Sequence, residues 1–164
     1  MRRAAAALLL ALAAAAPARA APVAPAFTLR LLDSRRTFDS RDAIAKTVLV
    51  VRFQASWCKP CAREAPELER LYARYKPLGV EVVGVHVQDT AADARRFLRE
   101  HKATYPAGLD PRLTIANRFG VTGTPYTVVI SPAGRLVARL PGESAVTRLP
   151  GILDPLTGRG RPAR

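Results

Sequence analysis

Several residue types are scarce in this chain of 164 residues, which has two cysteines, two histidines, one methionine and one tryptophan. No methionine-rich or histidine-rich cluster is present, which argues against a non-enzymatic copper-binding module, although the two thiols alone remain possible soft ligands. No basic run interleaves with aromatic residues, so nucleic-acid binding is not indicated, even though 26 basic residues face 13 acidic ones. No internal repeat or second domain is evident, and the length is sufficient for one domain with a sizeable core.

Only one uninterrupted apolar run is long, the thirteen residues of Ala4–Ala16. Two arginines precede it and the small-x-small pattern Ala18-Arg19-Ala20 follows it, which predicts a secretory signal peptide over residues 1–20. As a helix the run would span about 20 Å, less than the ~30 Å hydrocarbon core, so an uncleaved N-terminal anchor is the less favoured alternative. Because no cysteine follows the run, a lipoprotein anchor is excluded. We expect a periplasmic or otherwise secreted mature chain, without stable membrane insertion, in a compartment where a cysteine pair can be oxidised.

Residues 21–153 are expected to form one domain, and the Gly/Pro/Arg-rich residues 154–164 a disordered tail. Pro66 is expected to kink the first long helix, Thr90 and Asp93 form a capping box for the next, and Gly120 fits the C-cap of a third. The predicted strands cover 27–31, 37–38, 47–53, 80–87, 127–130 and 135–140, and the predicted helices cover 40–45, 60–75, 90–101, 112–119 and 144–153.

This order of elements predicts an α/β fold. The near-continuous apolar run 47–53 is typical of a strand covered on both faces, and a helix separates it from the run 80–87, so the two are expected to be parallel. A hairpin follows around the turn 131–134, where proline is second and glycine fourth. The result is a mixed central sheet flanked by helices, preceded by an N-terminal β-hairpin.

The two cysteines are separated by two residues in Trp57-Cys58-Lys59-Pro60-Cys61, between a predicted strand and a predicted helix. This puts Cys58 at the helix N-terminus, where the unpaired amides favour a thiolate. Cys58 can then attack a partner disulfide, and Cys61, one turn further on, can resolve the mixed disulfide. Lys59 adds a positive charge, Pro60 suits a first helical turn, and Trp57 offers an apolar surface to a partner. The pattern indicates redox chemistry at the thiols, with no cofactor and no metal.

Two other uses of the cysteines are weaker. A structural disulfide over so short a loop would restrain the unfolded chain little. A zinc site would need His86 and His101, which are fifteen residues apart and lack the usual spacing. We therefore expect both histidines to be packed or half exposed. A peroxidase of related fold is not indicated, because its Pro-x-x-x-Thr-x-x-Cys pattern is absent.

At these residues the chain resembles the thioredoxin superfamily and, within it, the TlpA/ResA-like thiol-disulfide oxidoreductases of bacterial envelopes. The resemblance covers about residues 27–142. Its motifs stand in the expected order, with Pro125 64 residues after Cys61. They are Phe53-x-Ala55-Ser56-Trp57-Cys58-Lys59-Pro60-Cys61-x-x-Glu64-x-Pro66, Gly84-Val85-x-Val87-Gln88-Asp89, Tyr105-Pro106 and Gly120-Val121-Thr122-Gly123-Thr124-Pro125.

The resemblance implies a thioredoxin fold with an N-terminal hairpin. It also implies that Thr124-Pro125 is the family's cis-proline bond, which faces the cysteines and binds extended substrate through the backbone of Thr124. Glu64 occupies the place of an acidic residue that takes up or supplies protons during exchange, and the alternative is an exposed first-turn glutamate favoured by the helix dipole.

Arg52 departs from the family pattern, which commonly has aspartate or asparagine at this position beneath the cysteines. Arginine does not give up its charge, so Arg52 cannot accept the proton of Cys61. If it points inward it must be paired, and Glu64 or Glu67 is the expected partner. Its charge is then expected to stabilise the thiolate and make the disulfide a stronger oxidant. The alternative is an Arg52 that faces solvent. Gln54 and Val128 stand where aromatic residues are usual, so the rim of the site is also expected to differ.

The resemblance implies a thiol-disulfide oxidoreductase that acts as a reductant, is kept reduced by a membrane thiol carrier, and serves clients such as apocytochrome c or copper-site proteins. Arg52 and Lys59 favour the alternative of a general disulfide oxidant. The residues alone leave the direction of electron flow open, because it depends on the reduction potential relative to the partner.

Overall fold

The computed structural model describes residues 21–34 and 36–158. The predicted signal peptide and the end of the predicted tail lie outside these residues. The helices and strands are β1 (Thr28–Arg30), β2 (Thr37–Asp39), α1 (Ser40–Ile44), β3 (Val48–Gln54), α2 (Lys59–Tyr75), a 3-10 turn (Lys76–Leu78), β4 (Val80–Val87), α3 (Ala91–Glu100), β5 (Ala107–Asp110), α4 (Thr114–Arg118), β6 (Tyr126–Ile130), β7 (Leu136–Pro141) and α5 (Ala145–Leu156).

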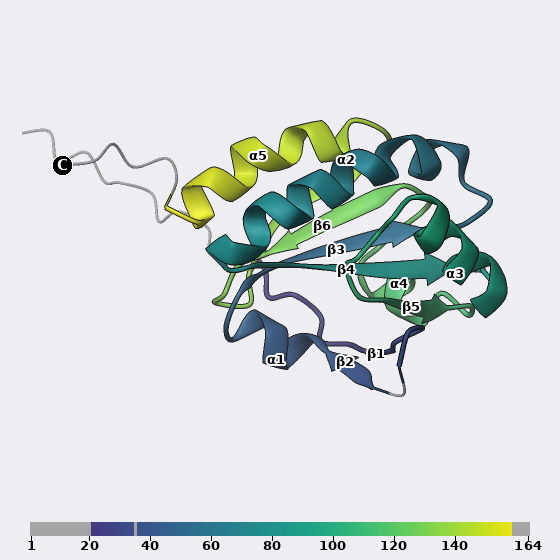
Figure 1. Cartoon of the computed structure of the whole chain (residues 1–164). Helices are drawn as coiled ribbons and strands as arrows, with labels where there is room; N and C mark the ends of the chain where they lie inside the picture. Colours follow the sequence, from purple (N-terminus) through teal and green to yellow (C-terminus); the bar gives the residue numbers. More distant parts are fainter. Residues whose placement is uncertain (1–20, 35, 159–164) are drawn as a thin grey trace, which may run out of the picture.

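A five-stranded sheet in the order β5-β4-β3-β6-β7 forms the centre of the domain (Figure 1). β3 is parallel to β4 and antiparallel to β6, and β4 is parallel to β5. Every residue of β3 is buried, as its apolar run predicts for a central strand. The N-terminal hairpin pairs β1 with β2 as a separate sheet. The predicted mixed sheet and N-terminal hairpin are confirmed.

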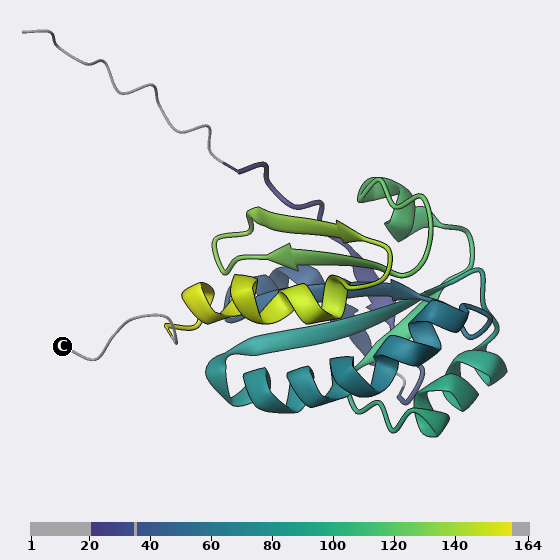
Figure 2. The ribbon, with the colours of Figure 1, turned by 90° about the horizontal axis from the view of Figure 1, so that it is seen from above.

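Helices cover both faces of the sheet. α2 and α5 lie side by side on one face, while α1 and the hairpin lie on the other (Figures 1 and 2). The alternation of side chains along β3 divides the core accordingly. Val48 and Val50 pack with Leu68 of α2 and Leu149 of α5. Leu49, Val51 and Phe53 pack with residues of the hairpin and of α4. The central strand is thus packed against core residues on both of its faces.

The sequence-based prediction missed β5. Its four residues, Ala107-Gly108-Leu109-Asp110, lack β-branched side chains and stand between two prolines, so they read as a loop. Tertiary pairing decides the outcome, because Gly84–Val87 of β4 offers a parallel partner. Gly108 is needed there, since a Cβ atom at this position would lie 2.3 Å from the carbonyl oxygen of Arg30.

Two helix boundaries also differ from the prediction. α4 begins at Thr114 rather than residue 112, because the buried Asp110 carboxylate accepts hydrogen bonds from the N–H groups of Ile115 and Ala116 at 2.9 and 2.8 Å. α5 continues to Leu156, so the prediction of a disordered tail from residue 154 is wrong for its first residues. Asp154 is held by the Tyr75 hydroxyl, which donates to its Oδ1 at 2.6 Å.

No helix in residues 21–34 and 36–158 is both long and apolar enough to cross a membrane.

Candidate active site

The cysteine pair lies where β3 ends and α2 begins. The Cys58 N–H donates to the Ala55 carbonyl at 3.2 Å, closing a turn between the two elements. Cys58 is the N-cap of α2, and its Sγ accepts a hydrogen bond from the Cys61 N–H at 3.2 Å. The two residues form a disulfide and are buried, with 4% and 1% of their surface exposed. The helix N-terminus therefore acts directly on the sulfur of Cys58.

The residues around the disulfide lie as the sequence pattern predicts. Pro60 is in the first turn of α2, and Lys59 is exposed. Trp57 is 59% exposed, and its indole N–H donates to the Gln88 carbonyl at 3.2 Å. The indole N–H is hydrogen-bonded, but the large apolar surface of the ring stays accessible.

Thr124-Pro125 is a cis peptide bond, as the resemblance implied. Phe53 of β3 is opposite Tyr126 of β6, so the C-terminal end of β3 and the N-terminal end of β6 lie next to each other at the same end of the sheet. Thr124 and Trp57 line one small groove of about 100 Å³, together with Gln88. The Thr124 hydroxyl is buried and has no hydrogen-bond partner among the described residues. The other lining residues are Val87, Leu113, Ala116, Val121, Thr122 and Gly123.

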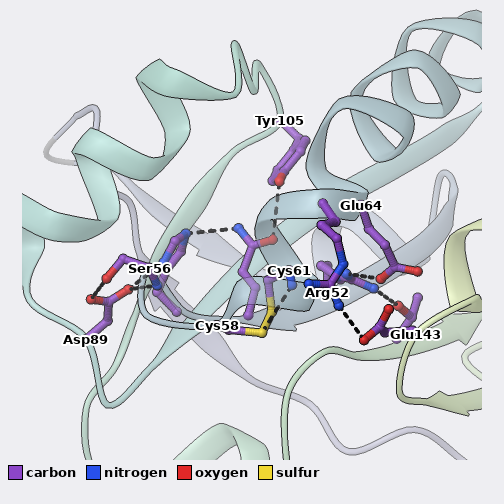
Figure 3. The surroundings of a disulfide bond; sticks show 12 residues. Arg52, Ser56, Cys58, Cys61, Glu64, Asp89, Tyr105 and Glu143 are labelled. Carbon is purple, nitrogen blue, oxygen red and sulfur yellow. Dashed lines mark hydrogen bonds and ion pairs between the residues drawn. A yellow bond between two sulfur atoms is a disulfide. The ribbon is translucent and has the colours of Figure 1, made fainter.

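Arg52 points inward and is paired, so the alternative of a solvent-facing arginine is wrong. Its Nη2 donates to Glu64 Oε2 at 2.6 Å and its Nη1 to Thr127 Oγ1 at 3.0 Å (Figure 3). The Arg52 and Glu64 side chains are only 1% and 13% exposed. The other expected partner, Glu67, pairs with Arg70 instead. The predicted burial and pairing of Arg52 are confirmed, with Glu64 as the counter-ion.

Glu64 is not the exposed first-turn glutamate of the alternative interpretation. Its second oxygen, Oε1, accepts a hydrogen bond from the Ser144 N–H at 2.8 Å, next to the start of α5. Beside it, Arg63 pairs with Glu143 at 2.6 Å on the surface. The carboxylate therefore links the active-site helix both to the central strand and to the connection between β7 and α5.

The sequence-based analysis missed a polar network on the other side of the cysteines. His86 is buried, with its Nε2 2.9 Å from Gln54 Nε2 and its Nδ1 2.9 Å from Asp89 Oδ2. Asp89 in turn accepts hydrogen bonds from the Ser56 N–H and hydroxyl, both at 2.7 Å (Figure 3). The Tyr105 hydroxyl donates to Gln54 Oε1 at 3.3 Å. Asp89 stood inside a recognised motif and Gln54 was noted as a departure from the family pattern, but nothing in their spacing showed that they share a hydrogen-bonded network.

Burial shapes the protonation of this network. It lowers the pKa of His86 below its ordinary value, more than the Asp89 carboxylate raises it. Burial raises the pKa of Asp89, but the hydrogen bonds from His86 and Ser56 outweigh it and hold that pKa below its ordinary value. Burial raises the pKa of Tyr105 to about 12. At neutral pH the ionisable groups of this network are therefore a neutral phenol, a neutral imidazole and a carboxylate.

The two histidines lie against the same aromatic ring and are not grouped with further potential zinc ligands among the described residues. Both contact the ring of Phe97, His86 at 5.5 Å and His101 at 4.6 Å between centroids. The two ring nitrogens of His86 are occupied by Gln54 and Asp89. Within residues 21–34 and 36–158, no three His, Cys, Asp or Glu side chains are grouped as a metal site would require.

A central strand that leads to a disulfide at a helix N-terminus, in a mixed sheet with helices on both faces, defines a thioredoxin-like thiol-disulfide oxidoreductase. Comparison with known proteins agrees. The AhpC/TSA family model matches residues 21–139. The chain is 36% identical to the thiol:disulfide interchange protein HelX of Rhodobacter capsulatus over 134 residues, covering 81% of this chain and 74% of HelX. It is 28% identical to the thiol-disulfide oxidoreductase ResA of Bacillus cereus, covering 82% and 76%.

Solved structures show the same fold. A crystal structure from Chlorobium tepidum named as the thiol:disulfide interchange protein DsbE aligns with a TM-score of 0.77 and 26% identity, covering 85% of this chain and 98% of that one. A secreted disulfide oxidoreductase of Mycobacterium tuberculosis aligns with a TM-score of 0.71 and 22% identity, covering 79% and 96%. The chain belongs to the AhpC/TSA family and is a TlpA/ResA-like thiol-disulfide oxidoreductase of the thioredoxin superfamily.

Proposed function

We propose that Cys58 is the nucleophile and Cys61 the resolving thiol in exchange with client proteins. In the reduced protein the Cys58 thiolate attacks a client disulfide, forms a mixed disulfide and releases one client thiolate, which takes up a proton. Cys61 then loses its proton and attacks Cys58 Sγ, which releases the second client thiolate and forms the Cys58–Cys61 disulfide. The position of Cys58 as N-cap of α2, with the Cys61 N–H directed at its sulfur, carries this assignment.

The client is proposed to lie across Trp57 and the Thr124-Pro125 segment. The groove lined by Trp57 and Thr124 is proposed to accept an apolar side chain of the client. The backbone of Thr124 is proposed to hydrogen-bond an extended client segment, as the strand edge of a sheet does. Lys59, exposed next to Cys58, adds a positive charge at the same rim.

Glu64 is proposed to take part in proton transfer during exchange. It stands three residues after Cys61 on α2, on the same side of the helix. Arg52 Nη2 and the Ser144 N–H both donate to its carboxylate and fix its position beside the active-site helix.

The proposed setting is extracytoplasmic, with electrons flowing from a membrane thiol donor through this protein to clients. The proposed clients are apocytochrome c or proteins with metal sites under assembly. The signal-like pattern of residues 1–20 and the membership in the ResA/HelX group support this setting.

The second candidate is a general disulfide oxidant, and the buried Arg52 is the observation that favours it. A cation near the cysteines stabilises the thiolate, and with it the reduced form, which makes the disulfide more oxidising. Because Glu64 compensates the charge of Arg52, this effect is smaller than that of an isolated cation.

Two measurements test the proposal. The reduced protein is expected to accelerate insulin reduction by dithiothreitol, while a Cys58→Ser variant is not. Equal rates would instead support a thiol-based copper-binding module. Equilibration of the Cys58–Cys61 couple with a glutathione buffer then gives its potential. A value nearer about −270 mV supports the reductant and one nearer about −120 mV the oxidant.

A further inference from the structure

A chain of buried polar side chains joins the ends of β3 and β4 beside the active-site turn. Gln54, the last residue of β3, is opposite His86 of β4 in the parallel register. Gln54, His86 and Tyr105 are 1%, 0% and 3% exposed. The side chain of Asp89, just after β4, is 2% exposed. Polar groups at this depth destabilise a fold unless they are hydrogen-bonded, so their mutual geometry is strongly constrained.

The donors and acceptors in this chain have a single consistent direction. The side-chain amide nitrogen of Gln54 can only donate hydrogen bonds, so His86 Nε2 accepts one from it. In the neutral imidazole ring the hydrogen is then on Nδ1. Nδ1 therefore donates to Asp89 Oδ2. At the other end, Gln54 Oε1 accepts from the Tyr105 hydroxyl, which agrees with the same orientation of the amide. The chain thus ends on the carboxylate of Asp89 and orients it.

Asp89 connects this chain to the active-site turn. Its two oxygens accept the Ser56 N–H and the Ser56 hydroxyl, both at 2.7 Å, and Oδ1 also accepts the Thr90 N–H at 3.0 Å. Ser56 is two residues before Cys58, inside the turn that the Cys58 N–H closes on Ala55. The carboxylate therefore holds that turn by two charge-assisted hydrogen bonds.

We propose that Gln54, His86 and Asp89 are positioning residues for thiol-disulfide exchange. By holding the N–H and the hydroxyl of Ser56, they fix Cys58 Sγ at the N-terminus of α2, where the thiolate is stabilised. Four hydrogen bonds from Ser56, His86 and Thr90 fix the Asp89 carboxylate, which acts through position and not through its field on the sulfur. The inference rests on the proposed role of Cys58 as the nucleophile and holds for either direction of electron flow.

Substitutions at Ser56 and Asp89 test the contact itself. The readout is the rate of Cys58 alkylation by iodoacetamide in the reduced protein as a function of pH, with the alkylated site identified by mass spectrometry. Asp89→Asn places an amide against two donors, and its rate at pH 7 is expected to fall about tenfold. Ser56→Ala loses one hydrogen bond, and its rate of Cys58 alkylation is expected to fall about threefold. Ser56→Thr keeps the hydroxyl and is the matched control, expected to react at the wild-type rate.

The equilibrium constant with glutathione gives a second readout. Asp89→Asn and Ser56→Ala are expected to shift it toward the disulfide, because the reduced form loses thiolate stabilisation. A tenfold shift corresponds to about 30 mV for this two-electron couple.

A triple variant separates positioning from stability. Gln54→Leu, His86→Phe and Tyr105→Phe together replace the polar chain with apolar side chains and leave no buried partner unpaired within it. Its melting temperature is expected to approach that of the wild type, while alkylation of Cys58 stays slow because Asp89 is no longer oriented. Recovery of both quantities would show a purely structural role and overturn the inference.

Two other results would also overturn it. One is faster alkylation in Asp89→Asn with an unchanged rate in Ser56→Ala, which would mean that the carboxylate acts by its charge alone. The other is wild-type alkylation in both variants. Loss of the proposed function is a distinct result, since a wild type no better than Cys58→Ser in insulin reduction leaves the alkylation series fully interpretable.

Discussion

Replacing Arg52 by methionine removes a buried cation and keeps an unbranched side chain at the same position. In the wild type, Arg52 Nη2 lies 2.6 Å from Glu64 Oε2, and the two side chains are 1% and 13% exposed. The change leaves Glu64 with the Ser144 N–H but without its counter-ion, and leaves the Thr127 hydroxyl without its donor. The converse change, Glu64→Gln, leaves the guanidinium as an uncompensated buried charge.

Each single variant is expected to lose about 3–5 kcal/mol of unfolding free energy, the range for breaking one side of a buried ion pair. For a domain of this size that is roughly 10–15 °C in melting temperature. Glu64→Gln is expected at the upper end, because Arg52 is the more deeply buried partner. The double variant removes both charges together and is expected to lie within about 2 kcal/mol of the wild type.

The reduction potential is expected to move in opposite directions in the two single variants. Glu64 stands one helical turn after Cys61, so in Arg52→Met an uncompensated negative charge disfavours the thiolate and makes the disulfide less oxidising. In Glu64→Gln the uncompensated Arg52 favours the thiolate and makes the disulfide more oxidising. A shift of one unit in the thiolate pKa corresponds to about 1.4 kcal/mol, or about 30 mV.

Urea unfolding gives the stability of the four proteins in this cycle, and glutathione equilibration gives their potentials. Additive losses in the double variant would refute the claim that the pair acts as a unit. Shifts of potential in the same direction for both single variants would refute the electrostatic reasoning, because opposite charges cannot produce them. Arg52→Asn also removes the cation and is expected to lower the oxidising strength in the same sense as Arg52→Met.

Three further expectations concern stability. The pKa of His86 is below 6.5 in the folded protein, so below about pH 6.5 the unfolded chain binds a proton at His86 that the folded chain does not bind. The contribution of His86 to the unfolding free energy is therefore fully present above about pH 6.5 and is lost as pH falls, by up to about 1.4 kcal/mol per pH unit. Urea unfolding at pH 7 and 5 should show a smaller loss in His86→Phe than in the wild type, with His101→Gln as control; an equal loss in His86→Phe contradicts this. Arg63→Ala breaks only an exposed pair with Glu143 and should change the unfolding free energy by less than about 1 kcal/mol, so a larger change in urea unfolding contradicts it. Asp110→Ala leaves two buried N–H groups of α4 without an acceptor and should cost about 2–4 kcal/mol, measured the same way, whereas a loss below about 1 kcal/mol would show that water replaces the carboxylate.

Local sequence patterns were sufficient to predict much of the fold. The apolar run of β3, the helical spacing after Pro60 and the capping box at Thr90 each depend on neighbouring residues, and the corresponding elements are present. The Thr90 hydroxyl accepts the Asp93 N–H at 3.1 Å, as a capping box requires. Such features are readable because their physical causes lie within a few residues of one another.

β5 and the end of α5 could not be read in the same way. The strand exists because β4 offers a parallel edge and Gly108 admits the backbone of Arg30. The helix continues past Leu153 because a tyrosine 79 residues away holds Asp154. In both cases the local signals, glycine and proline, point to a loop, and a distant partner outweighs them.

The sequence by itself determined the chemistry of this protein, because two thiols separated by two residues, between a strand and a helix, have few other uses. It also determined that a buried Arg52 needs a carboxylate, since an isolated charge is too costly inside a protein. Only the tertiary structure decided that Glu64 is that carboxylate, and that Gln54, His86 and Asp89 form one hydrogen-bonded network that ends on Ser56. Those contacts join different strands and loops, and their geometry is set by the packing of the sheet and its helices, which no local pattern records.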